Sequence, residues 1–193
     1  MTQLVIIFWD LGIGGVQTRI QGLVKKIIQQ HQDVTVTLLL YERRANEVSL
    51  PKHPRVKIKT FPGPKKFTWF GVKKKFWRFT TAQFAWWLFR ELWNNKPARM
   101  MTFLNRITTY VMPYVLLSKF MNFKTKLIIN EPVVMSRYLS QYDPRIWHWI
   151  TVANYRLADK IIVAAQAVKQ DLVRNFFASA KKIVVVRSWV AKL

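Results

Sequence analysis

The run Leu4-Val5-Ile6-Ile7-Phe8-Trp9, followed by Gly12-Ile13-Gly14-Gly15, establishes the type of fold. A short unbroken apolar run is typical of a buried strand, and the glycines after it indicate a turn. Beyond the turn, apolar residues recur at the spacing of one helix face, at Val16, Ile20, Leu23, Val24, Ile27 and Ile28. The chain therefore begins with a strand, a glycine turn and a helix.

The same alternation continues along the chain. Further strands are predicted at Val34 to Leu40, Arg55 to Phe61, Met100 to Leu104, Lys126 to Asn130, Lys160 to Ala164 and Lys182 to Val186. Helices are predicted at Val72 to Trp93, Thr108 to Met121 with an interruption or bend at Pro113, Pro144 to Leu157 and Ala167 to Phe177. Right-handed crossovers between such strands give a largely parallel sheet covered on both faces. We expect one α/β, Rossmann-like domain without an internal boundary.

The charge of the chain is strongly unbalanced. Its 193 residues include 32 Lys and Arg against nine Asp and Glu, a formal net charge of +23 at pH 7. About half of the residues are apolar, which excludes a disordered tail. So much positive charge indicates an anionic partner, and nucleic acid, acidic phospholipid head groups and a phosphorylated substrate all meet that requirement.

Several kinds of site are absent from the sequence. There is no Cys, which excludes disulfides, thiolate zinc sites and cysteine nucleophiles. His31, His53 and His148 are scattered, so we expect no metal and no bound cofactor. The first residues form a strand rather than a signal peptide, and no apolar run reaches the roughly 20 residues that span a bilayer.

A segment at about 62–93 mixes cations with large aromatic side chains. Lys and Arg gain about 1 kcal/mol each near an anionic bilayer, and Trp and Phe insert at the interface. We therefore predict peripheral attachment to an anionic membrane surface, on the cytoplasmic inner face. The residues expected to make this contact are Lys65, Lys66, Trp69, Phe70, Lys73, Lys74, Lys75, Trp77 and Arg78.

Two alternatives remain open for this segment. Its aromatic residues would also serve to pack a helix on the sheet, as part of Phe84 to Trp93 must. A cationic, aromatic surface would also bind single-stranded nucleic acid by stacking and phosphate contacts. The sequence has no RNP motif, helix-turn-helix signature or zinc spacing, so we do not expect a nucleic-acid partner.

Three segments carry a family resemblance. They are the glycine turn Gly12-Ile13-Gly14-Gly15-Val16-Gln17, the segment Lys96-Pro97-Ala98-Arg99-Met100-Met101, and a series made of Tyr155 to Val163, Val168 to Leu172 and Lys182 to Val190. Taken together they resemble the N-terminal domain of GT-B glycosyltransferases of the family 4 type, over almost the whole chain. The chain departs from the family pattern at Ala98, Ala165 and Ser188, where the family usually has Asp, Ser and Asn.

The resemblance implies a function shared between two domains. In such enzymes the N-terminal domain usually holds the acceptor, while a second Rossmann-like domain holds most of the nucleotide-sugar. Residues 1–193 would be the acceptor-side half, and a C-terminal domain or a partner chain would bind the donor, because Leu193 lies where the interdomain linker would begin. The alternative is a non-catalytic module that binds a membrane surface or carbohydrate, since several family polar positions are lost.

Candidate site residues follow the predicted strands. Gly14 and Gly15 open a helix, where N–H groups and the helix dipole receive phosphate, and the resemblance implies that they contact the donor diphosphate. The alternative is a tight turn. Glu131 follows a buried strand, where it would orient an acceptor hydroxyl, act as a base, or only cap a helix. Asn130 would face the acceptor, and Asp10 would bind a sugar hydroxyl or shape its loop.

Overall fold

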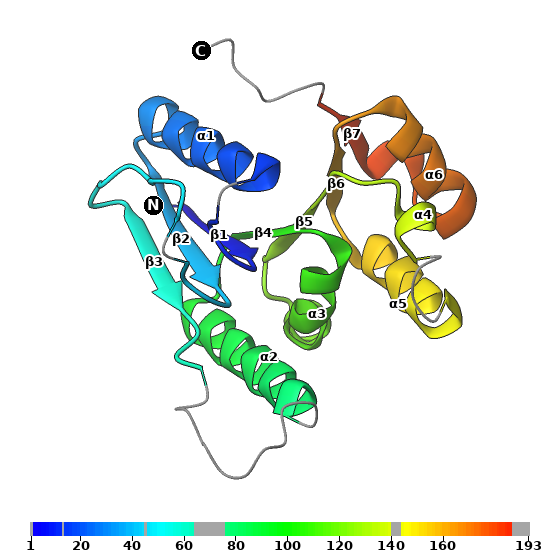
Figure 1. The fold of residues 1–193 in the computed structure, drawn as a ribbon, viewed down its shortest axis with the longest axis horizontal. Coiled ribbons are helices and arrows are strands. Elements are labelled where there is room, and N and C mark those ends of the chain that lie inside the picture. Colours follow the sequence, from blue (N-terminus) through cyan, green and yellow to red (C-terminus); the bar gives the residue numbers. More distant parts are fainter. Residues whose placement is uncertain (1, 13, 45, 64–75, 140–143, 187–193) are drawn as a thin grey trace.

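The structure, a computed structural model, describes residues 2–12, 14–44, 46–63, 76–139 and 144–186 (Figure 1). Its strands are β1 Thr2–Phe8, β2 Val34–Leu40, β3 Val56–Thr60, β4 Arg99–Phe103, β5 Lys126–Glu131, β6 Lys160–Val163 and β7 Ile183–Val185. Its α-helices are α1 Gly15–Gln30, α2 Phe76–Asn95, α3 Asn105–Phe120, α4 Met135–Leu139, α5 Pro144–Leu157 and α6 Gln166–Phe176, and a 3-10 turn, Ala180–Lys182, precedes β7.

The strands form one sheet in the order β3-β2-β1-β4-β5-β6-β7, and every neighbouring pair is parallel. The predicted Rossmann-like α/β fold is therefore confirmed. The chain starts at β1 and builds outward to β3, then returns to β4 and builds outward in the other direction to β7. The direction of building reverses between β1 and β4, and in open parallel sheets such a switch point is where ligands bind.

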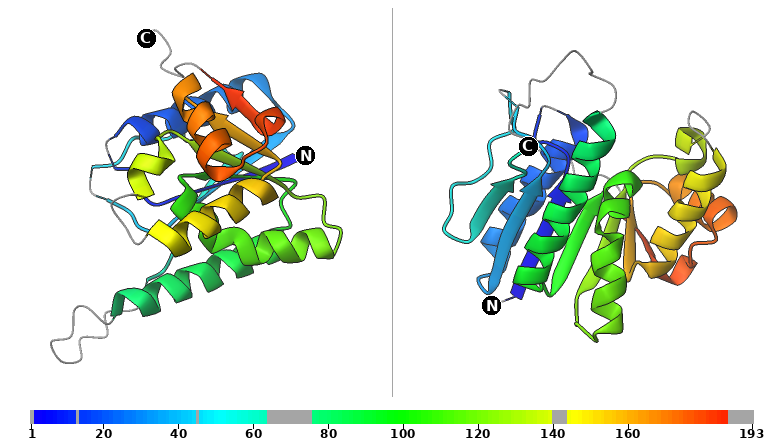
Figure 2. Two further views of the ribbon diagram at one scale, coloured as in Figure 1. Left: turned by 90° about the vertical axis from the view of Figure 1, so that its right-hand side faces the viewer. Right: turned by 90° about the horizontal axis from the view of Figure 1, so that it is seen from below.

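The two faces of the sheet are covered unequally. One face packs on α2, α3, α4, α5 and α6, and Figure 2 shows α2 and α3 in front of the strands when the molecule is seen from below. Within the described residues, α1 is the helix that packs on the other face. On that face Ile128 of β5 and Ile162 of β6 are only partly buried, and Val184 of β7 is 40% exposed.

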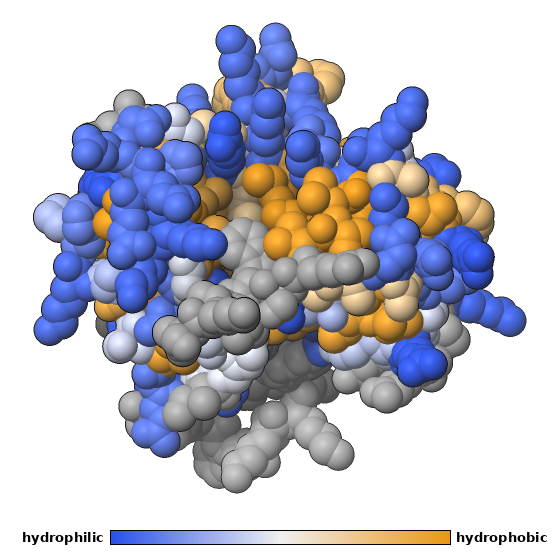
Figure 3. Space-filling model, turned by 90° about the horizontal axis from the view of Figure 1, so that it is seen from above, coloured by the Kyte–Doolittle hydropathy of each residue, from blue (hydrophilic) through white to orange (hydrophobic). Residues whose placement is uncertain are grey.

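This uneven cover follows from the topology. Right-handed crossovers that build in opposite directions place their helices on opposite faces, so α1 stands alone over β1 and β2. Figure 3 views the molecule from the side of α1 and shows apolar side chains gathered between hydrophilic ones. Part of the sheet therefore presents an apolar surface.

Several element bounds differ from the sequence prediction by one residue, and three helices differ by more. The helix expected at Val72 to Trp93 begins at Phe76 within the described residues and runs on to Asn95. Helix α3 begins at Asn105 and passes through Pro113 without an interruption. Pro113 is exposed, so water can bond the carbonyl that its missing N–H leaves free. Helix α4 was not predicted, because five residues are too few to show a helical period.

Candidate functional site

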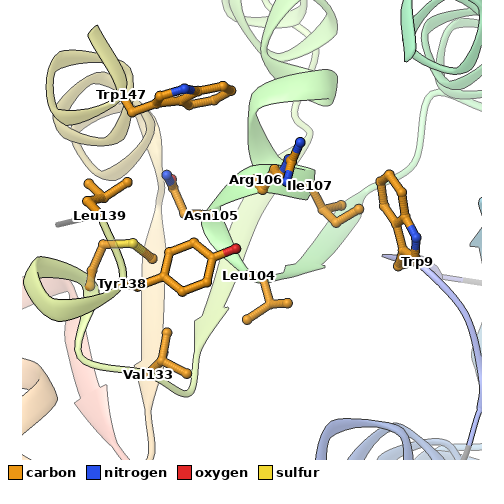
Figure 4. Close-up of a pocket in the computed structure, with 10 residues that line it drawn as sticks. Trp9, Leu104, Asn105, Arg106, Ile107, Val133, Tyr138, Leu139 and Trp147 are labelled. Carbon is orange, nitrogen blue, oxygen red and sulfur yellow. The ribbon is translucent and has the colours of Figure 1, made fainter. Parts of the chain in front are cut away.

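A pocket of about 240 Å³ lies at the carboxyl ends of β1, β4 and β5, beside the switch point of the sheet (Figure 4). Figure 4 shows Trp9, which follows β1, and Trp147, from α5, on opposite sides of it. The lining residues are Trp9, Leu104, Asn105, Arg106, Ile107, Val133, Met135, Tyr138, Leu139 and Trp147. The pocket thus occupies the place where this type of fold binds its ligands.

Leu104, which connects β4 to α3, and the first three residues of α3 line the pocket, and hydrogen bonds to β5 hold this connection in place. Leu104 has a φ of 72°, in the left-handed region that a leucine rarely adopts. Its N–H donates to the carbonyl oxygen of Asn130 at 3.1 Å. The N–H of Asn105 donates to Oε2 of Glu131, also at 3.1 Å. Backbone strain of this kind persists where neighbouring contacts fix the turn, as they do here.

A buried polar network fixes α3 against α5. Asn105 donates through Nδ2 to Oγ1 of Thr151 at 2.6 Å, and Nδ2 of Asn154 donates to Oδ1 of Asn105 at 2.7 Å. Asn154 also donates to Oγ1 of Thr109 at 3.0 Å. Both helices line the pocket, so the network sets the relative position of two of its walls.

Glu131 is fully buried and lies behind the pocket wall, outside its lining. Oε2 accepts hydrogen bonds from Asn105 N–H and from the Tyr155 hydroxyl, both at 3.1 Å, whereas Oε1 has no hydrogen-bond partner among the described residues. Burial raises the pKa of Glu131 to about 8, although Tyr155, Asn105 and the nearby Val133 N–H act to lower it. The carboxyl group is thus mostly protonated at neutral pH.

Asn130 and Asp10 are buried as well. Asn130 ends β5 beside Glu131 and is not part of the lining. Asp10 closes the loop after β1: Oδ1 accepts a 2.8 Å hydrogen bond from Gly12 N–H, and Oδ2 lies 3.2 Å from Nη2 of Arg44. A Cβ on Gly12 would come within 2.9 Å of Asp10 Oδ1, which explains the glycine there.

Gly14 and Gly15 stand at the amino end of α1. The carbonyl of Gly14 accepts hydrogen bonds from the N–H and the hydroxyl of Thr18, each at 3.0 Å. A Cβ on Gly14 would meet the flexible end of Gln17. Gly15 is exposed, and a Cβ there would meet nothing within 4 Å. The protein's own packing therefore gives no reason for a glycine at position 15.

The predicted membrane contacts fall at the limits of the structure. Lys65, Lys66, Trp69, Phe70, Lys73, Lys74 and Lys75 lie outside the described residues, and Trp77 and Arg78 belong to α2 at positions whose side chains are not described. Further along α2, Phe84 and Trp87 pack into the core, while Trp86 is 67% exposed. Within the described residues no helix has both the length and the apolar character to cross a membrane.

The exposed side of α2 carries a stacked aromatic row. Trp86 stacks on Phe89 and Phe89 on Trp93, with ring centroids 5.8 and 5.9 Å apart. The row ends at Phe123, 5.6 Å from Trp93, and Nζ of Lys96 lies 4.8 Å from the Phe123 ring. Aromatic and cationic groups thus lie together at the end of the predicted segment and continue beyond it to Lys96 and Phe123.

Most of the pocket lining was not singled out from the sequence. Trp9 and Asn105 each stand at the carboxyl end of a strand, the same signal that selected Glu131, and could have been found by it. Tyr138 and Trp147 come from α4 and α5, and no pattern in the sequence places these helices at the pocket.

No family model and no curated protein sequence matches this chain. Solved structures do share its fold. The lipopolysaccharide outer core galactosyltransferase WaaB is 14% identical, with a TM-score of 0.64 over 99% of this chain and 46% of that chain. A sucrose-phosphate synthase chain from Thermosynechococcus elongatus is 10% identical, with a TM-score of 0.62 over 98% of this chain and 90% of that one. UDP-GlcNAc 2-epimerase from Neisseria meningitidis, bound to UDP-GlcNAc, is 11% identical, with a TM-score of 0.56 over 96% and 45%.

These structural similarities identify the fold of this chain. The chain has the Rossmann-like fold of one half of a GT-B protein, as its glycine turn and C-terminal series predicted. It spans about half the length of WaaB and of the epimerase. The GT-B neighbours include glycosyltransferases and an epimerase, so the fold alone does not assign the reaction.

Proposed function

We propose that this chain is the acceptor-side half of a glycosyltransferase, which transfers sugar from a nucleotide-sugar to a membrane-associated acceptor. A C-terminal domain or a partner chain would bind the donor. The observation that carries this proposal is the pocket at the switch point of half a GT-B fold. An acceptor bound there would lie at the sheet edge that a second Rossmann-like domain must face to deliver a donor.

The partly exposed face of the sheet supports the proposal that a second domain or a partner chain packs on this one. Ile128, Ile162 and Val184 would gain from burial under an apolar element of another domain or chain. The whole domain, 1–193, would then form one wall of the completed site.

The proposed function is tested first on the native protein. This protein is isolated from source membranes in mild detergent, its intact mass is measured, and co-purifying chains are identified. We expect a longer product, or a stoichiometric partner with a second Rossmann-like domain, and transfer of labelled sugar from a nucleotide-sugar to extracted lipid. A lone 22.9 kDa chain without transfer would reject the proposal.

Gly15 is proposed to contact the donor diphosphate, because its exposed backbone opens the amino end of α1 and no packing requires a glycine there. Gly15→Ala is expected to lower kcat/KM of the completed enzyme at least about tenfold, since a methyl group would hold the diphosphate away from the N–H groups. The free energy of unfolding of this variant should differ from that of the wild type by less than about 1 kcal/mol.

Gly22→Ala is the matched control, because Gly22 is also exposed on α1 with nothing within 4 Å of its Cβ position. It should raise stability by about 0.5–1 kcal/mol through helix propensity and leave transfer unchanged. Full activity in Gly15→Ala would remove Gly15 from the donor site.

Membrane attachment through the basic segment is the remaining part of the proposal. Changing Lys73, Lys74 and Lys75 together to Glu should weaken binding to anionic liposomes at least about 100-fold in a sedimentation assay, because each lysine contributes about 1 kcal/mol. Reversal of Lys25, Lys26 and Lys181, which are exposed elsewhere, is the charge-matched control. Equal losses in both triple variants would show that net charge, rather than this segment, drives attachment.

A non-catalytic binding module is the second candidate, and one observation favours it. No acidic side chain among the described residues lines the pocket, and Glu131, Asn130 and Asp10 are all buried. Under this alternative the protein binds its membrane or carbohydrate ligand, and no donor domain restores transfer.

A further inference from the structure

The pocket is poorly suited to a sugar. Of the ten lining residues that the structure describes, eight are apolar or aromatic, and the other two are Asn105 and Arg106. The Asn105 side chain is already committed to Thr151 and Asn154. A sugar needs a hydrogen-bond partner for nearly every hydroxyl that it buries, so this lining favours hydrocarbon.

The pocket is large enough to hold part of a hydrocarbon chain. A volume of about 240 Å³ holds about eight groups of the size of water, at roughly 30 Å³ each. A short length of alkyl or isoprenyl chain would fill it between Trp9 and Trp147, which stand on opposite sides (Figure 4).

Among the described residues of the lining, Arg106 is the one that carries a charge. It stands in the first turn of α3 and is half-buried. A guanidinium group pairs with phosphate or carboxylate through two parallel hydrogen bonds, and no described residue of the lining is a carboxylate that would repel such a ligand. A ligand with a hydrocarbon chain and an anionic group matches both features.

Two of the lining residues, and the helix that supplies Trp147, expose apolar side chains. Val133 and Tyr138 line the pocket and are 36% and 38% exposed. Helix α5, which supplies Trp147, exposes Ile146 and Trp149 three residues apart, each by about two thirds. Residues at this spacing share a helix face, and such an exposed apolar face beside a pocket suits a membrane interface.

We propose that the pocket binds the hydrocarbon chain of an anionic lipid, with Arg106 beside its phosphate or carboxylate group and Ile146 and Trp149 resting on the membrane. The inference rests on the proposed function in one respect: it names the class of acceptor. Binding itself requires no donor and no transfer.

The full chain is titrated with dodecyl phosphate below its micelle concentration, and heat of binding is recorded by calorimetry. Dodecanol and inorganic phosphate are the two comparison probes. We expect dodecyl phosphate to bind at least tenfold more tightly than either, because each comparison probe lacks one half of the ligand. Equal affinity for inorganic phosphate would make this a plain anion site, and equal affinity for dodecanol would remove the role of Arg106; either result overturns the proposal.

Two variants locate the binding. Val133→Trp fills the pocket from its exposed mouth and should weaken dodecyl phosphate binding at least tenfold. Val184→Trp adds the same bulk at similar exposure on β7, outside the lining, and should leave binding unchanged. Equal affinities in the two variants would place the probe elsewhere.

Two charge variants keep the test decisive if Val133→Trp fails to fold. Arg106→Gln should weaken dodecyl phosphate binding about tenfold and leave dodecanol binding unchanged. Tyr138→Glu places a carboxylate at the exposed mouth and should weaken the anionic probe in the same way. Unchanged affinity for dodecyl phosphate in both variants would reject the anionic class of ligand. Lipid binding without sugar transfer in any completed assembly would reject the proposed transferase and retain this inference.

Discussion

Glu131→Ala is expected to lower the free energy of unfolding by about 2–5 kcal/mol at pH 4, where the carboxyl is protonated in the folded protein, whereas Glu131→Gln should lower it little at that pH. The alanine leaves Asn105 N–H and the Tyr155 hydroxyl buried without their acceptor, at about 1–3 kcal/mol each. The glutamine oxygen replaces Oε2 as the acceptor of both bonds. Chemical denaturation of the three proteins, followed by circular dichroism, measures the differences.

The pH dependence of stability should distinguish Glu131 from Glu131→Gln. The pKa of this carboxyl is raised from 4.5 in the unfolded chain to about 8 in the folded protein. Below pH 4.5 the group is protonated in both states and its contribution to stability is fully present. Between pH 4.5 and 8 unfolding releases a proton, so stability relative to Glu131→Gln should fall by up to about 1.4 kcal/mol per pH unit and level off above pH 8.

Tyr155→Phe provides a second check on the same group. The Tyr155 hydroxyl donates to Oε2 and acts to lower the pKa of Glu131, so its removal should raise that pKa further and extend the falling limb to higher pH. Parallel pH profiles for the wild-type protein and Glu131→Gln would show that the carboxyl is ionised in the folded protein.

These properties of Glu131 explain why sequence reasoning located it but could not describe it. Its place at the end of a strand follows from the local apolar pattern of Ile128 and Ile129. Its burial depends on Asn105 and Tyr155, which are 26 and 24 residues away in the sequence. Local pattern therefore predicts which edge of the sheet a residue reaches, whereas tertiary packing decides whether it faces the pocket or lies behind its wall.

The other sequence predictions show the same difference between local pattern and tertiary packing. The strands and the parallel sheet could be predicted, because apolar runs and glycine turns act locally. The pocket could not, since Tyr138 and Trp147 reach it from helices whose positions depend on the network of Asn105 and Asn154. For the glycine pair, the position at the start of α1 agrees with the sequence prediction. The contact of Gly14 and Gly15 with a donor stays a prediction.

Phe84→Ala is expected to cause the largest loss of stability among single aromatic truncations on α2, about 3–5 kcal/mol. Phe84 has no exposed surface and, within the described part of the chain, contacts five other aromatic rings. Their ring centroids lie 5.0–6.2 Å from its own, and they belong to Trp9, Tyr41, Phe61, Trp87 and Tyr110. The alanine would leave a cavity under Tyr41, on which Trp9 stacks at 4.3 Å.

Trp86→Ala is the matched control, two residues further along the same helix and 67% exposed. It removes a larger side chain but should change stability by less than about 1 kcal/mol, because most of that side chain already faces water. Denaturant unfolding compares the two variants, and dodecyl phosphate titration reports on the pocket. Trp9 lines the pocket and packs against the Phe84 ring. Phe84→Ala should therefore also weaken binding of dodecyl phosphate under conditions where the variant stays folded. Equal stability losses in the two variants would mean that α2 does not pack on the sheet through Phe84.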